Sequence, residues 1–310
     1  MPPRARHVLI ELAALPCLLV GPADASAQAT APLPRALGLP VSTRAMALGD
    51  AYMMDAGHAD ALFYHPALLA GAGGFGLDVQ QWNGESWSSA ASAAMEWFGG
   101  GVGVGLVTLQ YSAPAAGSAA VPPGQDFLFT SGPTPVSERV AVVGLARELF
   151  GIDVGVAAKL VEQRVGSARD AEGQFDVGAA TELGPLTVGL TVHDLGHEPL
   201  AATGNDEVGA SRVVLGVGGY GQPVGPLDVG LSAAAAANSD EVLLSGGIEI
   251  GYWPIRGRTF LARFGLGQVP DGSEVTPLSF GLAYWGDNLM LEWAFQPHRG
   301  NTHRIGLRWR

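Results

Sequence analysis

Hydrophobic and polar residues alternate one by one along most of the chain after residue 74. The run LMLEWAFQ, from Leu289 to Gln296, is an example, with large apolar side chains at every odd position and smaller or polar ones at most even positions. Successive side chains of a strand point to opposite faces, so each run predicts a strand with one apolar and one polar or small face.

These runs predict about fourteen strands. They are expected at residues 74–82, 86–95, 101–111, 137–149, 152–162, 174–182, 186–193, 212–220, 227–236, 241–253, 259–267, 276–285, 288–296 and 302–310. Most approach the roughly 9–11 residues that a tilted strand needs to cross a bilayer. Connections after even-numbered strands are short, whereas several others are long, notably 112–136, 163–173 and 194–211. This arrangement is typical of outer-membrane barrels with periplasmic short turns.

The composition favours a barrel whose apolar face is outside. Hydrophobic residues make up 47% of the chain and charged residues only 15%, whereas soluble domains have about 25% charged residues. The net charge of −12 excludes a nucleic-acid partner, because no basic run is present to track phosphates. The sequence therefore predicts an all-β, antiparallel transmembrane β-barrel in the outer membrane, surrounded by its lipid, with both termini in the periplasm.

The first 27 residues read as a secretory signal peptide. Arg4 and Arg6 precede an apolar run at 8–20, and Ala25-Ser26-Ala27 is a small-x-small cleavage site. The only cysteine, Cys17, lies in that run, so the mature chain is expected to have no disulfide.

Aromatic residues gather near the ends of the predicted strands. We expect them to form girdles at the membrane interfaces, although aromatic residues also favour strands in general. The set comprises Trp82, Trp87, Trp97, Tyr111, Tyr252, Trp253, Tyr284, Trp285 and Trp309.

Residues 38–71 do not alternate and contain short helical spacings. Their apolar content, including Leu62 and Leu69, favours burial. A barrel of this size has room for a plug. We therefore expect these residues, called the hatch below, to fill the lumen; the alternative is an arm outside the barrel. The predicted division is a signal peptide at 1–27, a periplasmic arm and hatch at 28–73, and a barrel at 74–310.

The stretch STRAMALGDAYMMDAGHADALFYHPALLAG at 42–71 resembles the N-terminal signature of the PorV/PorQ family, within the wider FadL-like outer-membrane proteins. The ending GNTHRIGLRWR resembles the family's last strand. His65 stands where the family usually has Asn, and Arg310 follows the terminal aromatic Trp309. The hatch-motif residues carried by the resemblance are Arg44, Leu48, Gly49, Asp60, Phe63, Tyr64, His65 and Pro66.

The resemblance implies a fourteen-stranded barrel with an N-terminal hatch, inserted by the barrel-assembly machinery. It implies two alternative functions. PorV-like members bind or shuttle secreted proteins with other components of type IX secretion, and Phe127, Leu128 and Phe129 in the long loop are the candidate partner contacts. FadL-like members instead transport hydrophobic small molecules such as fatty acids or hydrocarbons. A transporter is expected to have an apolar pocket near the hatch and a kink in a strand beside it.

Charged residues on the polar strand faces are expected to line the lumen. Glu292 and Arg304, on neighbouring strands, are expected to pair. Such pairs would fix register and dock the hatch; an ion-selective lining is the less favoured alternative. The set comprises Asp78, Arg147, Asp153, Lys159, Asp176, Glu249, Arg263, Glu292, Arg304 and Arg308.

The sequence does not predict an enzyme or a cofactor. His193, Asp194 and His197 lack a third ligand with metal spacing and a nucleophilic serine. The glycines Gly101, Gly103 and Gly105 alternate with apolar residues and precede no helix, so they are expected to leave lumen space and not to bind phosphate.

Overall fold

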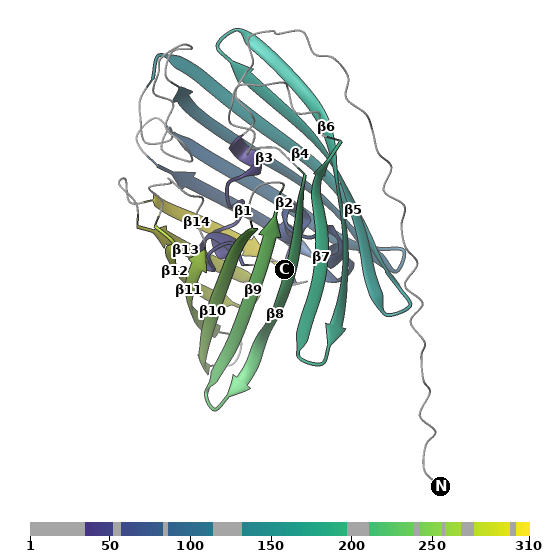
Figure 1. Cartoon of the computed structure of the whole chain (residues 1–310). Coiled ribbons are helices and arrows are strands. Elements are labelled where there is room, and N and C mark those ends of the chain that lie inside the picture. The colour runs from purple at the N-terminus through teal and green to yellow at the C-terminus, as the bar shows by residue number, and fades with distance from the viewer. Residues whose placement is uncertain are drawn as a thin grey trace.

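Fourteen antiparallel strands close into a barrel, with β1 paired to both β2 and β14 (Figure 1). The computed structural model describes residues 35–51, 57–82, 86–113, 132–196, 211–238, 242–255, 258–267, 276–297 and 302–310. The predicted signal peptide and most of the loops at 112–136 and 194–211 lie outside these residues. The predicted fold class is confirmed.

The barrel strands are β1 (Gly74–Gln81), β2 (Trp87–Trp97), β3 (Gly100–Ala113), β4 (Thr134–Leu149), β5 (Ile152–Val165), β6 (Ala168–Leu183), β7 (Leu186–Leu195), β8 (Arg212–Val224), β9 (Leu227–Ala237), β10 (Val242–Ile255), β11 (Arg258–Gly267), β12 (Leu278–Gly286), β13 (Leu289–Gln296) and β14 (Thr302–Trp309). None of the helices in the described residues is long and apolar enough to cross a membrane.

The apolar side chains of the strands face outward. On β1, Phe75, Leu77 and Val79 are exposed, whereas Asp78 and Gln80 at alternate positions are buried. The same alternation continues through most of the wall, with exposed leucines on β11 and β13. Since a soluble barrel would bury these large side chains, the outer surface fits a hydrocarbon surrounding.

One predicted loop is absent. Residues 163–173 form no long loop, because β5 and β6 continue as a paired hairpin that turns at Gly166. Their pairing includes Arg169 with Glu162 on the same face, with 2.6 Å between Nη2 and Oε2. The polar residues that predict a loop here instead lie in the paired ends of β5 and β6, where many side chains are charged.

The aromatic girdle is smaller than predicted. Trp82 and Tyr111 are buried and belong to the luminal core, and Trp285 packs inward beside Met290. These three positions fall on the luminal side of the alternation. The exposed aromatic residues of the predicted set are Trp87, Trp97, Tyr252, Trp253 and Trp309.

Candidate functional site in the barrel lumen

Four short helices precede β1 and lie inside the barrel (Figure 1). They are η1 (Arg35–Leu37), α1 (Thr43–Ala47), η2 (Ala59–Phe63) and η3 (Pro66–Gly71). The Ser42 hydroxyl caps α1 by accepting from the Ala45 N–H at 3.1 Å. Pro66 occupies the first turn of η3, where its missing N–H costs no helical hydrogen bond. The residues at the start of α1 and η3 thus favour a helix beginning at each position.

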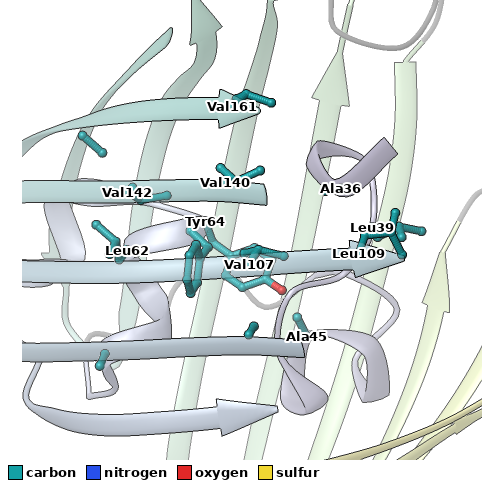
Figure 2. Packing of buried hydrophobic residues seen from close by; sticks show 14 of the residues in the cluster. Ala36, Leu39, Ala45, Leu62, Tyr64, Val107, Leu109, Val140, Val142 and Val161 are labelled. Atoms are coloured by element: carbon teal, nitrogen blue, oxygen red, sulfur yellow. The ribbon is translucent and has the colours of Figure 1, made fainter. Parts of the chain in front are cut away.

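The inward side chains of the hatch pack against luminal valines and leucines. Leu62 and Tyr64 lie beside Val107, Val140 and Val142, on strands β3 and β4 (Figure 2). Leu48, Leu62 and Leu69 have no exposed surface. The described part of the hatch is therefore buried as deeply as a protein core. The barrel strands that surround it carry their apolar outer side chains towards lipid.

Glycines in the wall give the hatch its seat. A Cβ on Gly155 would lie 2.4 Å from the Ala67 nitrogen, and one on Gly101 would lie 1.7 Å from the Leu69 carbonyl oxygen. On the opposite wall, a Cβ on Gly265 would lie 2.0 Å from the Gly49 nitrogen. Gly103 and Gly105 likewise face Leu69 and Phe63. The glycine run on β3 thus makes room for the hatch.

A buried network of ion pairs joins the hatch to the wall. Arg44 of α1 contacts Glu249 at 3.0 Å, and its guanidinium lies 4.6 Å from the centre of the Tyr220 ring. Asp60 of η2 accepts from Arg308 at 3.3 Å. The main-chain N–H of Thr43 donates to Asp78 at 2.7 Å. Two helices of the hatch are therefore tied to strands β1, β10 and β14.

The wall charges also pair with each other. Arg263 donates to Glu249 at 2.6 Å and contacts Glu292. Arg308 lies 2.8 Å from Asp78 and 3.5 Å from Glu292. The predicted Glu292–Arg304 pair is wrong, because the register places Glu292 opposite Gly306. Arg304 instead donates to the Pro40 carbonyl and to Ser88, so it holds the chain just before α1.

A second buried cluster lies on strands β5 to β7. Lys159 contacts Asp176 at 2.8 Å and Asp194 at 2.7 Å, and His193 Nδ1 lies 3.0 Å from Asp176. The β6–β7 register shifts beside Asp176. Since the extra residue of a bulge breaks the alternation, both His193 and Asp194 are buried. Sequence alternation alone does not predict this inward pair.

His65 faces this cluster from the hatch. Its ring lies against Gly178 of β6, beside the Thr191 hydroxyl and the backbone of Leu190. Burial, followed by the charge of His193, lowers the pKa of His65 to about 4. Burial likewise raises the pKa of the neighbouring Tyr64, whose hydroxyl accepts from the Val41 and Ser42 N–H groups. Both side chains are therefore neutral near pH 7.

An apolar cavity of about 340 Å³ lies in the wall next to the hatch. It is lined by Leu244, Ser245, Gly246, Leu266, Gly267 and Pro277. The β10–β11 pairing ends here at Ser245 and Gly267, while β10 continues beside β9. A Cβ on Gly49 would lie 2.7 Å from the Leu266 nitrogen, so the hatch turn closes the luminal side of this notch.

The remaining residues predicted from the sequence lie at different places in the structure. Asp153 lies near the short-turn end of β5, and Arg147 points outward, contrary to its expected luminal position. Phe127, Leu128, Phe129 and His197 lie outside the described residues. No group of three or more His, Cys, Asp or Glu side chains in the described ranges has the spacing of a metal site.

One buried carboxylate escapes the sequence reasoning. Glu138 accepts from the Ala36 N–H at 2.7 Å, from Tyr111 at 2.9 Å and from Gln163 at 3.1 Å. It thereby fixes η1 to strands β3 to β5. It stands on the inward face of β4 among Val136, Val140 and Val142, so alternation of apolar and polar residues gives no signal for it.

The closed sheet, the lipid-facing exterior and the luminal helices define a fourteen-stranded membrane barrel with a plug. Similar solved structures include the Pseudomonas putida toluene transporter TodX, with a TM-score of 0.55 and 11% identity over 86% of this chain and 95% of that chain. A Pseudomonas aeruginosa FadL homologue has a TM-score of 0.53 and 10% identity over 87% and 96%. At such identities the likeness establishes the fold, which supports a location in the outer membrane.

A further similar structure is a TodX monoaromatic hydrocarbon channel variant, with a TM-score of 0.55 and 12% identity over 86% of this chain and 96% of that chain. No protein-family model matches the chain, and no curated protein matches it. The PorV/PorQ assignment within FadL-like barrels therefore stays a prediction.

Proposed function

We propose that the protein lets uncharged hydrophobic small molecules cross the outer membrane. The cavity between β10 and β11 carries this proposal. Its volume is at the lower end of the roughly 300–1,000 Å³ of small-molecule sites. Two leucines and a proline line it, and none of the described residues in its lining is charged. An aliphatic or aromatic hydrocarbon matches this chemistry better than an ion.

The route follows from the position of the cavity. Leu244 and Leu266 are exposed on the lipid-facing wall, so a ligand dissolved in the membrane reaches the cavity without entering water. The hatch turn at Gly49 lies directly behind it. Passage into the lumen thus requires the turn to move, and the ion pairs of Arg44 and Asp60 set the resistance to that movement.

Two further observations support transport. The register of β6 and β7, which the hatch contacts, shifts beside Asp176, and such a bulge favours the bend that a transporter is expected to have in a strand beside the hatch. TodX is described as a toluene transporter and as a monoaromatic hydrocarbon channel, and this chain shares its fold.

Filling the cavity tests the proposal. In Gly246→Phe, the new Cβ would meet only the Ser232 carbonyl oxygen at 3.8 Å, so the wall accommodates it while the ring enters the notch. Gly173→Phe is the matched control, because a Cβ there meets nothing within 4 Å. We expect Gly246→Phe to slow entry of the hydrophobic dye N-phenylnaphthylamine into cells whose lipopolysaccharide outer leaflet excludes it, about tenfold relative to the control. Equal uptake by the two variants would contradict transport through this cavity.

Type IX secretion remains a hypothesis carried by the resemblance alone, because its candidate contacts Phe127, Leu128 and Phe129 lie outside the described residues. Crosslinking in cells followed by purification separates the two functions. Secreted proteins attached to the barrel would support the adaptor, and bound hydrocarbons or fatty acids would support the transporter.

A further inference from the structure

Two neighbouring short turns each present an exposed phenylalanine. Phe98 in the β2–β3 turn is 83% exposed, and Phe150 in the β4–β5 turn is fully exposed. The two hairpins lie side by side, because β3 pairs with β4. Trp97 extends the group, with its ring centre 5.0 Å from that of Phe98. Together they form an apolar edge at the short-turn end of the barrel.

Both phenylalanines stand where a hairpin turn disfavours a bulky residue. Phe98 has φ 47° and Phe150 has φ 56°, and a glycine with positive φ follows each. Such two-residue turns favour Asn-Gly or Asp-Gly. Asp287 occupies the same left-handed conformation, with φ 44°, in the β12–β13 turn. The fold therefore does not require phenylalanine at this position, and its presence in two adjacent turns needs another reason.

The height of the apolar belt supplies that reason. On the outer face, Ser89 of β2 contacts Thr108 of β3 at 2.9 Å, and Arg139 of β4 is exposed. These polar residues mark the upper edge of the belt. From Ser89 to Phe98 the chain descends about 23 Å, and from Arg139 to Phe150 about 29 Å, at roughly 3.4 Å per residue and a tilt of about 40°.

A transmembrane barrel has an apolar band about 25 Å tall. Phe98 therefore lies near the opposite border of the band and Phe150 about 4 Å past it, which is the depth of the headgroup layer. Between the borders, the outward positions of β2 and β5 carry only alanine, methionine, tryptophan and aliphatic residues, such as Met95, Val156 and Leu160. The exposed carboxylates next to the turns, Glu96 and Glu148, stand at the alternate positions of β2 and β4 and not on this outward face.

Arg147 is the exception within this belt. It faces outward on β4 between Leu145 and Leu149, both exposed. A long side chain with a terminal charge can extend from an apolar surface to the lipid headgroups. Its guanidinium matches a phosphate, which it can bind with two parallel hydrogen bonds.

We propose that these two turns are a lipid anchor: Phe98 and Phe150 insert into the headgroup layer of the near leaflet, and Arg147 binds a phospholipid phosphate there. Aromatic residues favour that layer because it is partly apolar. The turn formed by Gly184 and Pro185 and the turn at Asp287 carry no aromatic tip. On β10 and β14 the exposed aromatic residues of this end, Trp253 and Trp309, lie in the strands and not at the tip of a turn.

Site-directed spin labels test the depth of these turns. The only cysteine is Cys17, so residues 28–310 accept a single label through Phe98→Cys, Phe150→Cys or the matched control Asp287→Cys. In vesicles of phosphatidylethanolamine and phosphatidylglycerol, we expect labels at 98 and 150 to have about threefold lower accessibility to an aqueous nickel chelate than the label at 287. Accessibility as high as at 287 would overturn the proposal and favour a protein partner for this edge.

A turn-optimised variant provides an independent test. Phe98→Asn with Phe150→Asn suits the left-handed turns, so we expect unchanged or higher thermal stability in detergent but about fivefold less insertion into the same vesicles. Asp287→Asn should leave insertion unchanged. Arg147→Gln should lower insertion in phospholipid vesicles, whereas Arg164→Gln on the exposed hairpin end should not. Insertion of the double variant equal to that of the unmodified chain would refute the anchor.

Discussion

At the scale of single residues, His65 has the least common environment in the hatch. It has no exposed surface, and the Gly178 backbone leaves just enough space for its ring. His193 of β7 is the charged neighbour that opposes a proton on His65, and the carboxylates of Asp176 and Asp194 already hold Lys159. A proton on His65 would therefore meet burial and the repulsion of His193, which outweigh the nearby backbone acceptors of His65 and Leu190.

This environment predicts a loss of stability in acid. The pKa of His65 is about 4 in the folded protein against an ordinary value of 6.5, so between these values the unfolded chain binds the extra proton. Stability is complete above pH 6.5 and falls as the pH drops towards 4. From pH 7 to pH 4.5 the free energy of unfolding should decrease by about 2–3 kcal/mol through this residue.

The measurement is urea unfolding in detergent at both pH values, with His65→Asn as the comparison. The asparagine variant should lose less stability on acidification, because its side chain does not titrate. An identical acid response of the two proteins would show that His65 is not the sensitive group.

At the scale of elements, the wall charges that contact the hatch also contact other wall charges. These wall charges therefore keep a partner when the hatch is removed. Without the hatch, Glu249 still contacts Arg263, and Asp78 still contacts Arg308. The wall strands also keep their complete ladders. A buried pair is costly to break when one partner remains uncompensated, and this arrangement avoids that for these wall charges.

Deleting residues 38–71 should therefore leave a folded barrel with an open lumen. A barrel of this size without its plug resembles a porin in width, so single-channel conductance in planar bilayers should rise by about tenfold or more. The heat-dependent shift in gel mobility is the control for folding of the barrel. A folded deletion variant with unchanged conductance would mean that the hatch does not block the lumen.

At the scale of the whole molecule, the exposed leucines show that the barrel is stable in lipid and not in water. Leu160, Leu231 and Leu282 are each more than half exposed, and they lie on different sides of the barrel. Each exposed large side chain costs about 1.5–3 kcal/mol relative to burial in an apolar medium. Summed over the wall, this favours lipid or detergent over water.

We expect the refolded chain to sediment as aggregates in detergent-free buffer and to run as a single species when detergent is present. Analytical ultracentrifugation of one preparation in both conditions makes the comparison. A monodisperse particle in plain buffer would contradict the membrane assignment and the lipid anchor with it.

Particular residues show how far the sequence reaches. Alternation from Leu289 to Gln296 predicts which side chains of β13 face lipid, and the structure agrees. The expectation that charged residues face the lumen is wrong for Arg147, which stands at an outward position of β4. Alternation also misses the cavity at Leu244 and Leu266, since a gap depends on where neighbouring strands end.

The sequence by itself therefore determined the fold class, the approximate strands and the inversion of the apolar face. These follow from a period of two, which each segment carries alone. Only the tertiary structure decided the partners of Glu292, the bulge that turns both His193 and Asp194 inward, and the glycine seats of the hatch. Such features depend on register between strands far apart in the chain, and no local pattern of residues specifies that register.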